Sequence, residues 1–374
     1  MRRFLSRSCA VLLTSIVALG AVELFLRARA TATAFRVWPP GLSVELEPDP
    51  EILHGIHGPS RFRVSSLGFR GDEDPGEGAL ALLALGGSTT ECLYLDQAEA
   101  WPALLEDELA RALGRKVWVA NAGRSGRTTR DHACQLRHLL AQEPRFERVL
   151  LSTGVNDLCA WLAAGTSATA PAEDLARAFE VVPRTSAGGP WWRRSAVFEL
   201  LRRADERRSM ALLAQDPRGS VYTTWRAHRA GAHDWVDELP DPAPALARFR
   251  SELMDLLASC ERHGADLALV TQPSLWSASL APEREAWLWM GGIGDYQERP
   301  GCDYYTAAAL ARGLELFNGE LRSFARAHAL PLLDPANALS DEAECFYDDV
   351  HFNEEGARRV AHFLAVGLEE LERN

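Results

Sequence analysis

The sequence of 374 residues contains almost no lysine: Lys116 is the only one, and it stands at the start of an apolar segment. A phosphate-binding loop of the Walker type needs a lysine after a glycine-rich turn, so that class of protein is excluded. Chemistry through a lysine Schiff base is not expected either. Acidic residues outnumber basic ones, 52 against 40, which gives a formal net charge of −12. Because nucleic-acid binding needs a concentrated positive surface, we expect no nucleic-acid partner.

Metal-binding patterns are missing as well. The chain has no CxxC pair and no cluster of cysteine and histidine, so we predict no metal site, and no cofactor is expected. Cysteines do occur outside the N-terminal apolar run, at positions 92, 134, 159, 260, 302 and 345. In an oxidising compartment these six could form up to three disulfides, but their spacing does not select a pairing.

The first 30 residues differ in composition from the rest of the chain. Arginines near the start precede an apolar run over residues 8–22, a pattern that indicates an export segment. The run is at the lower limit for crossing a bilayer, and residues 28–30, Ala-Arg-Ala, resemble a signal-peptidase site. Residues 1–30 are therefore a predicted signal anchor or signal peptide, with a buried helix as the third alternative. We expect a single-pass protein of the cell membrane with its main domain outside the cytoplasm, or else a secreted or periplasmic protein.

Residues 31–78 are rich in proline and glycine, and we interpret them as a linker and lead-in segment. Apolar runs that end on glycine or proline then alternate with helical patterns. Strands are predicted at residues 81–88, 116–123, 147–154, 265–273 and 330–335. This alternation predicts an α/β domain over residues 79–374, built on one doubly wound parallel sheet of about five strands. Insertions at about 158–244, with a predicted helix around 195–215, and at 274–303 interrupt it.

Candidate functional residues follow four of the five predicted strands. Ser88 follows the first strand in "GGSTTE", Gly126 the second in "NAGRSG", and Asn156 the third in "GVND". Asp348 and His351 follow the last strand in "DDVH". Since functional groups of an open parallel sheet gather at the carboxyl ends of its strands, we expect these residues to meet.

Together these residues supply the parts of an acyl-transfer site. Ser88 is the candidate nucleophile because it begins a predicted helix, whose free N–H groups stabilise negative charge. His351 is the candidate base, and Asp348, three residues earlier, would hold its imidazole in one tautomer. The backbone N–H groups of Ser88 and Gly126 and the side-chain amide of Asn156 form the candidate oxyanion hole.

Each motif also has a plainer interpretation. A glycine-serine turn is common, and "GVND" and "DDVHFNEEG" are typical of turns and helix caps. Asp349 competes with Asp348, although the D-x-x-H spacing favours Asp348, and we expect Asp157 to make structural hydrogen bonds. Arg124 and Arg127 flank the second motif and are candidates for binding an anionic substrate, or are simply solvated.

These motifs resemble the four blocks of the SGNH, or GDSL-like, hydrolase family. The resemblance implies a flavodoxin-like three-layer α/β/α sandwich and the catalytic roles just given for Ser88, Asp348 and His351. The stretch "SSLGFRGDE" before the first strand is similar to stretches found ahead of the serine motif in membrane-tethered bacterial members of the family. One position departs from the family pattern, because the aspartate usual before the serine is Gly87 here.

The resemblance implies a serine esterase or acylhydrolase that works through an acyl-serine intermediate. An O-acyltransferase using the same intermediate and a non-catalytic glycan-binding or assembly protein are the alternatives. Eight tryptophans lie in or beside the two insertions, where they would either line a cap over the site or fill its core. We expect the partner to be an ester-bearing small molecule, glycan or lipid of the cell envelope, and the sequence makes no prediction of oligomeric state.

Overall fold

The computed structural model describes residues 14, 17–27, 35–142, 145–163, 195, 197, 216–340 and 342–373. The chain divides into two units, Met1–Phe35 with Phe179–Leu213, and Arg36–Ala178 with Ala214–Asn374. In the first unit, residues 17–27 are helical and expose several apolar side chains. Of the helices that the structure describes, none combines the length and the apolar character needed to cross a membrane. The helix predicted around 195–215 lies almost wholly outside the described residues.

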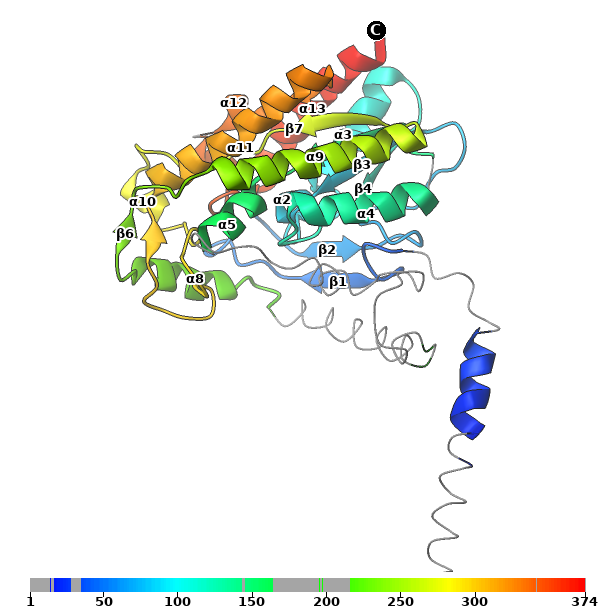
Figure 1. Ribbon diagram of the computed structural model, residues 1–374, viewed down its shortest axis with the longest axis horizontal. Coiled ribbons are helices and arrows are strands. Elements are labelled where there is room, and N and C mark those ends of the chain that lie inside the picture. The colour runs from blue at the N-terminus through cyan, green and yellow to red at the C-terminus, as the bar shows by residue number, and fades with distance from the viewer. Residues whose placement is uncertain are drawn as a thin grey trace, which may run out of the picture. The chain divides into compact units, whose positions relative to one another are not determined.

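The second unit is built on a five-stranded parallel sheet (Figure 1). Its strands are β3 (Leu80–Gly86), β4 (Val117–Asn121), β5 (Arg148–Ser152), β7 (Asp266–Val270) and β9 (Leu332–Leu333). They are arranged in the order β4-β3-β5-β7-β9, which is the flavodoxin-like order 2-1-3-4-5. Every residue of the interior strand β3 is buried, as expected for a parallel sheet covered on both faces. The predicted fold class is confirmed.

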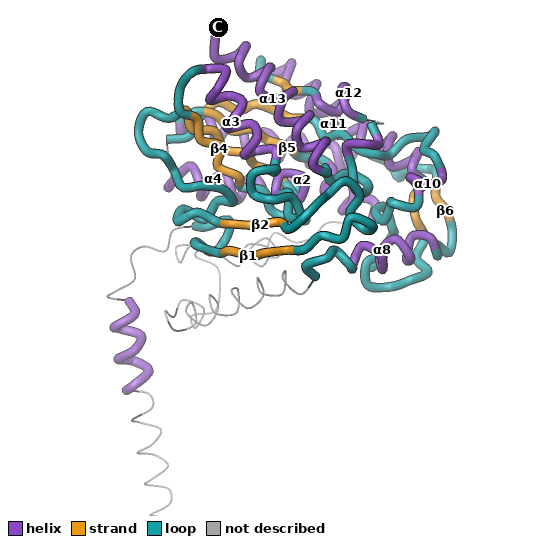
Figure 2. Tube along the Cα trace, turned by 180° about the vertical axis from the view of Figure 1, so that it is seen from behind, coloured by secondary structure: helices purple, strands orange, loops and turns teal. Residues whose placement is uncertain are grey.

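Helices cover both faces of the sheet, as Figures 1 and 2 show from opposite sides. On one face lie α3 (Trp101–Leu113) and α13 (Glu354–Arg373), which pack against each other. The other face carries α4 (Thr129–Gln142), α5 (Val155–Ala163), α9 (Ala243–His263) and α11 (Ala307–His328). Their apolar residues recur at helical spacing, such as Trp101, Leu105 and Leu109 on α3, so each helix buries one stripe against the core.

The segment before the first sheet strand packs against the edge of the sheet. It contains the antiparallel strands β1 (Ser43–Leu46) and β2 (Ser60–Arg63). Beside the edge strand β4, the backbone N–H of Arg70 donates to the carbonyl of Asn121 at 3.0 Å. Residues 36–78 therefore cover an edge that would otherwise expose unpaired backbone groups.

The two insertions contact each other, because Arg226 Nε of the first donates to the Trp287 carbonyl of the second at 3.0 Å. The first contributes α8 (Val221–Ala230) and β6 (Trp235–Val236), and the second contributes α10 (Pro282–Glu285). Strand β6 pairs with β8 (Tyr304–Tyr305), which directly follows the second insertion. The remaining short elements are α2 (Ser88–Glu91), α12 (Pro335–Leu339) and the 3-10 helix η4 (Ala343–Cys345).

The disulfides considered from the sequence are not formed. All six cysteines outside the N-terminal run are free thiols. Three of them are buried in separate elements, with Cys92 at the end of α2, Cys260 in α9 and Cys345 in η4. Each fills part of the core on its own, as free cysteines commonly do.

Candidate active site

The structure brings Ser88, His351 and Asp348 into one hydrogen-bonded series. Strand β3 ends at Gly86, and α2 begins directly afterwards at Ser88. The Ser88 Oγ atom lies 2.7 Å from His351 Nε2. On the other side of the ring, His351 Nδ1 lies 2.7 Å from Asp348 Oδ2 and 2.9 Å from Asp348 Oδ1. With the ring proton on Nδ1, the free Nε2 is placed to accept the serine proton.

The Asp348 carboxylate is fully buried and held by donors on both of its oxygens. Oδ1 accepts from the backbone N–H groups of Val350 at 3.0 Å and His351 at 2.8 Å. Oδ2 accepts from the indole N–H of Trp289 at 2.8 Å. Burial opposes ionisation, but the charge of His351 and these hydrogen bonds outweigh it, so the pKa of Asp348 lies below its ordinary value. The carboxylate is therefore ionised and fixed in direction.

The neighbouring Asp349 is directed toward the second insertion instead. Its carboxylate accepts from Trp276 Nε1 at 2.7 Å and from the backbone N–H of Trp289 at 2.8 Å. Burial, followed by the nearby charge of Asp348, raises the pKa of Asp349 to about 6. Of the two adjacent aspartates, the structure thus places Asp348 at the imidazole and Asp349 at the insertion.

The imidazole of His351 is enclosed by aromatic rings. Tyr347 stacks on it with 5.5 Å between ring centroids, and Tyr222 of α8 presents its edge at 6.4 Å. Burial alone would lower the pKa of His351, but the charge of Asp348 and its hydrogen bond outweigh burial and raise it. The first insertion therefore contributes a wall of the site through Tyr222.

The candidate oxyanion donors lie on the turns after three adjacent strands. Ser88 follows β3, while Gly126 follows β4 and Asn156 follows β5, the two neighbours of β3 in the sheet. A Cβ atom on Gly87 would lie 2.5 Å from Asn156 Nδ2, so the absence of a side chain there admits this amide close to the nucleophile turn. Gly126 has a φ of +72°, the left-handed conformation that glycine adopts readily.

Glu91, which the sequence analysis did not assign, supports the turn that carries Gly126. Its buried carboxylate accepts from the backbone N–H of Ser125 and, at 2.7 Å, from the Ser125 hydroxyl. The indole N–H of Trp38 donates to the Gly123 carbonyl in the same turn at 3.0 Å. The only signal in the sequence was the position of Glu91, three residues after the serine in "GGSTTE".

Arg124 and Arg127, the candidates for binding an anionic substrate, make contacts within the protein. Arg124 Nη1 donates to the Val37 carbonyl at 2.9 Å, and its guanidinium lies over the Trp38 ring. The carbonyl of Arg127 accepts from Asn156 Nδ2 at 2.9 Å. Arg124 thus fastens the lead-in segment to the second motif, and Arg127 orients the amide of Asn156.

Gln272, after β7, links two of the turns. Its Oε1 accepts from the Val155 N–H at 2.7 Å, next to Asn156, and its Nε2 donates to Thr89 Oγ1 at 2.9 Å, next to Ser88. One side chain therefore fixes the nucleophile turn relative to the turn that carries Asn156. Sequence reasoning missed this residue, because nothing in "VTQPS" distinguishes it from an ordinary strand end.

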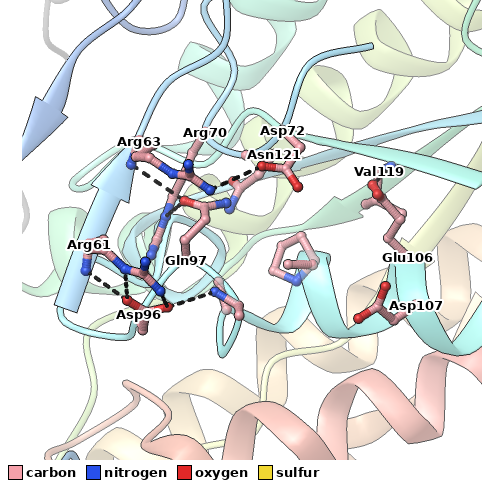
Figure 3. Close-up of a pocket in the computed structure, with 15 residues that line it drawn as sticks. Arg61, Arg63, Arg70, Asp72, Asp96, Gln97, Glu106, Asp107, Val119 and Asn121 are labelled. Atoms are coloured by element: carbon pink, nitrogen blue, oxygen red, sulfur yellow. Dashed lines mark hydrogen bonds and ion pairs between the residues drawn. The ribbon is translucent and has the colours of Figure 1, made fainter. Parts of the chain in front are cut away.

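A polar pocket of about 140 Å³ adjoins the other end of α2 (Figure 3). The fully buried Arg70 lines it and donates through Nη1 to the Glu91 carbonyl and through Nη2 to the Leu95 carbonyl at 2.7 Å. Asn121 Nδ2 donates to the Thr90 carbonyl at 2.9 Å. These donors satisfy the carbonyls of Thr90 and Glu91 at the end of α2, which the short helix leaves without partners, and the carbonyl of Leu95 in the segment that follows.

Asp157 and Cys92 lie near the motifs, and their contacts are with the protein's own core. Asp157 accepts hydrogen bonds from the Thr129 backbone N–H and hydroxyl, and burial raises the pKa of Asp157 to about 6. Burial raises the pKa of the Cys92 thiol to about 11, which keeps it protonated. Within the described ranges, no group of three or more His, Cys, Asp or Glu side chains is placed to hold a metal ion.

Comparison with known proteins adds the family. Residues 84–359 match the model of the GDSL-like lipase/acylhydrolase family. No curated protein sequence matches the chain. Similar solved structures include a lipolytic protein of the G-D-S-L family from Desulfitobacterium hafniense DCB-2, with 12% identity, a TM-score of 0.40 and coverage of 77% of this chain and 99% of that one.

Two further solved structures are similar to this chain. Esterase EstA from Pseudoalteromonas sp. shows 14% identity and a TM-score of 0.38, with 79% of this chain and 100% of that chain covered. Est24, a carbohydrate acetylesterase from Sinorhizobium meliloti, shows 12% identity and a TM-score of 0.41, with coverage of 78% and 99%. The family match spans more than half of the chain, which therefore belongs to the GDSL-like lipase/acylhydrolase family and is an ester-hydrolysing enzyme.

Proposed function

We propose that Ser88 is the nucleophile of a carboxylic ester hydrolase, with His351 as general base and acid and Asp348 as the residue that orients it. The observation that supports this proposal is the series of contacts from Ser88 Oγ through both nitrogens of the His351 ring to the Asp348 carboxylate. The same three groups, in the same relation, activate serine in unrelated hydrolases.

In the proposed reaction, Ser88 Oγ attacks the ester carbonyl carbon while its proton moves to His351 Nε2. The resulting oxyanion accepts hydrogen bonds from the Ser88 and Gly126 N–H groups and from the Asn156 amide. Collapse of this intermediate breaks the bond to the alcohol, which leaves with the proton from Nε2. Water then attacks the acyl-serine, again giving its proton to His351, and the carboxylic acid is released as Ser88 recovers its proton.

We propose further that the enzyme is exported and acts on an acyl or acetyl ester of an envelope glycan or lipid. The support for export and membrane attachment is the N-terminal sequence, an arginine-rich start followed by the apolar run 8–22. The support for a carbohydrate or acyl substrate is the number of tryptophans in the two insertions. Transfer of the acyl group to a sugar hydroxyl would use the same acyl-Ser88 and differs only in the final acceptor.

Partition between water and a sugar acceptor tests this proposal. The purified protein is incubated with an activated acetyl ester, with and without a hexose or oligosaccharide, and free acetate and acetylated sugar are quantified. A hydrolase is expected to release acetate at the same rate without the sugar. A rate that depends on the sugar, with acetylated sugar as the main product, would replace hydrolysis by transfer. The Ser88→Ala variant measures the background.

A further inference from the structure

Trp289, in the second insertion, makes two contacts with the adjacent aspartates of the active-site turn. Its indole N–H donates to Asp348 Oδ2 at 2.8 Å, and its backbone N–H donates to Asp349 Oδ2 at 2.8 Å. The side chain of Trp289 is almost fully buried. One residue of the insertion therefore contacts both carboxylates, and its side chain contacts the one that faces His351.

Rings of the first insertion hold the Trp289 indole in place. Trp225 of α8 stacks on it, with 4.5 Å between centroids and 29° between planes. Tyr222 presents its edge to the same indole at 5.9 Å and also to His351. An indole packed on a face and an edge has little rotational freedom, so its N–H keeps a fixed direction toward Asp348.

The contact between Trp289 and Asp348 fills a particular gap in the hydrogen bonding of this carboxylate. Oδ1 already has two backbone donors, from Val350 and His351. Oδ2 has the imidazole Nδ1 and the Trp289 indole as its partners. Without the indole, the imidazole Nδ1 would be the only hydrogen-bond partner of Asp348 Oδ2.

We propose that Trp289 is a positioning residue for the catalytic triad. Its indole N–H fixes Asp348 Oδ2 and stabilises the negative charge of that oxygen, so the second insertion completes the active site. The inference rests on the proposed function, because it assigns Trp289 to the triad of that reaction. It also gives the two insertions a shared role: residues of the first hold Trp289, and Trp289 holds the aspartate.

The expected effect on His351 has a definite sign. A donor to the carboxylate weakens the stabilisation that Asp348 gives to the imidazolium, so removing the donor raises the pKa of His351 further. As a general base His351 must be neutral, so kcat/KM falls as the pH drops below that pKa. The other titratable side chains around the imidazole are Asp349, Glu91, Tyr222 and Tyr347, and none of them is substituted in the test.

The test compares Trp289→Phe with Trp276→Phe. Both tryptophans are buried and each donates its indole N–H to one of the two adjacent aspartates, Trp289 to Asp348 and Trp276 to Asp349. Phenylalanine keeps an aromatic ring and removes the N–H. The pH dependence of kcat/KM is measured on an activated ester. We expect the acid limb of Trp289→Phe to move upward by about 0.5 to 1 pH unit, which is about three- to tenfold less activity on that limb.

In the control Trp276→Phe, the acid limb is not expected to move upward. Loss of the Trp276 donor raises the pKa of Asp349, and this weakens the charge that raises the pKa of His351. An unmoved limb in Trp289→Phe, or an equal shift in both variants, would overturn the inference. If Trp289→Phe does not fold, Trp225→Leu decides: removing the stacked ring should shift the limb in the same direction by less, and no shift rejects the inference. Activity that persists in Ser88→Ala would instead reject the proposed function, so the two failures are distinguishable.

Discussion

Replacing Asp348 by asparagine is expected to lower kcat by about 10⁴-fold, as the same substitution does in another serine triad, where it selects the wrong tautomer of the histidine. The two backbone N–H groups at Oδ1 would select the amide oxygen for that position. The amide NH₂ would then occupy the position of Oδ2 and face His351 Nδ1. A donor there favours the tautomer with its proton on Nε2, which cannot accept the proton of Ser88. Steady-state kinetics on an activated ester measures the loss.

Asp349→Asn is the matched control for this variant. Asp349 is the next residue and is equally buried. It contacts Trp276 and the backbone of Trp289, whereas Asp348 contacts the imidazole of His351. We expect the kcat of Asp349→Asn to stay within about tenfold of the wild type, since no proton-transfer group is changed. A loss in Asp349→Asn equal to that in Asp348→Asn would show that the assignment of the orienting aspartate is wrong.

Replacing Arg70 by leucine is expected to have the largest effect on stability, a loss of about 3 to 5 kcal/mol in the free energy of unfolding. The buried guanidinium donates to carbonyls of Glu91, Cys92 and Leu95 and lies over the Phe62 ring. Leucine would leave those buried carbonyls without their donors. Urea denaturation followed by tryptophan fluorescence measures the change.

Arg61→Leu provides the comparison for Arg70→Leu within the same pocket (Figure 3). Arg61 pairs with Asp96 at 2.9 Å, but more than half of its side chain is exposed. Ion pairs at the surface are screened by water and contribute little to stability, so we expect a much smaller loss. Equal destabilisation by the two substitutions would contradict the role given to Arg70.

The features predicted well from the sequence are those that depend on local pattern. The five strands are apolar runs that end at glycine or proline, and all five are present in the sheet. Because parallel strands end at one edge, the order of the chain was enough to expect Ser88, Asp348 and His351 near one another. The D-x-x-H spacing favoured Asp348 over Asp349, and in the structure Asp348 is the one that contacts His351 Nδ1.

The features that were not predicted depend on contacts between distant segments. Trp289 and Asp348 are 59 positions apart, and the insertion between β7 and α11 has no periodic pattern that would indicate the contact. Arginine is usually found at the protein surface, and Arg70 lies in a segment interpreted as a linker and lead-in, yet its side chain is fully buried. Glu91 and Gln272 act through single side-chain hydrogen bonds to neighbouring turns, which sequence spacing does not encode.

Three tryptophans of the insertions pack inside the protein beside the active-site turn, which is one of the two roles considered for them. Trp276 and Trp289 fill the core of the insertions and donate to the aspartates, and Trp225 stacks on Trp289. Trp235 is 45% exposed, and the guanidinium of Arg229 lies over its ring, 5.0 Å from the centroid. Trp191 and Trp192 lie outside the described residues. The buried Trp276 and Trp289 therefore both pack in the core and donate hydrogen bonds to the two adjacent aspartates.

The central claim is that Ser88 is the catalytic nucleophile, and covalent labelling tests it most directly. The purified protein is treated with a serine-directed fluorophosphonate, digested, and analysed by mass spectrometry, beside Ser88→Ala and His351→Ala. We expect one equivalent of label on the peptide that contains Ser88 in the wild type, none in Ser88→Ala, and strongly slowed labelling in His351→Ala, because the base that activates the serine is gone. Labelling of Ser88→Ala at the wild-type rate, or of another residue in the wild type, would contradict the account.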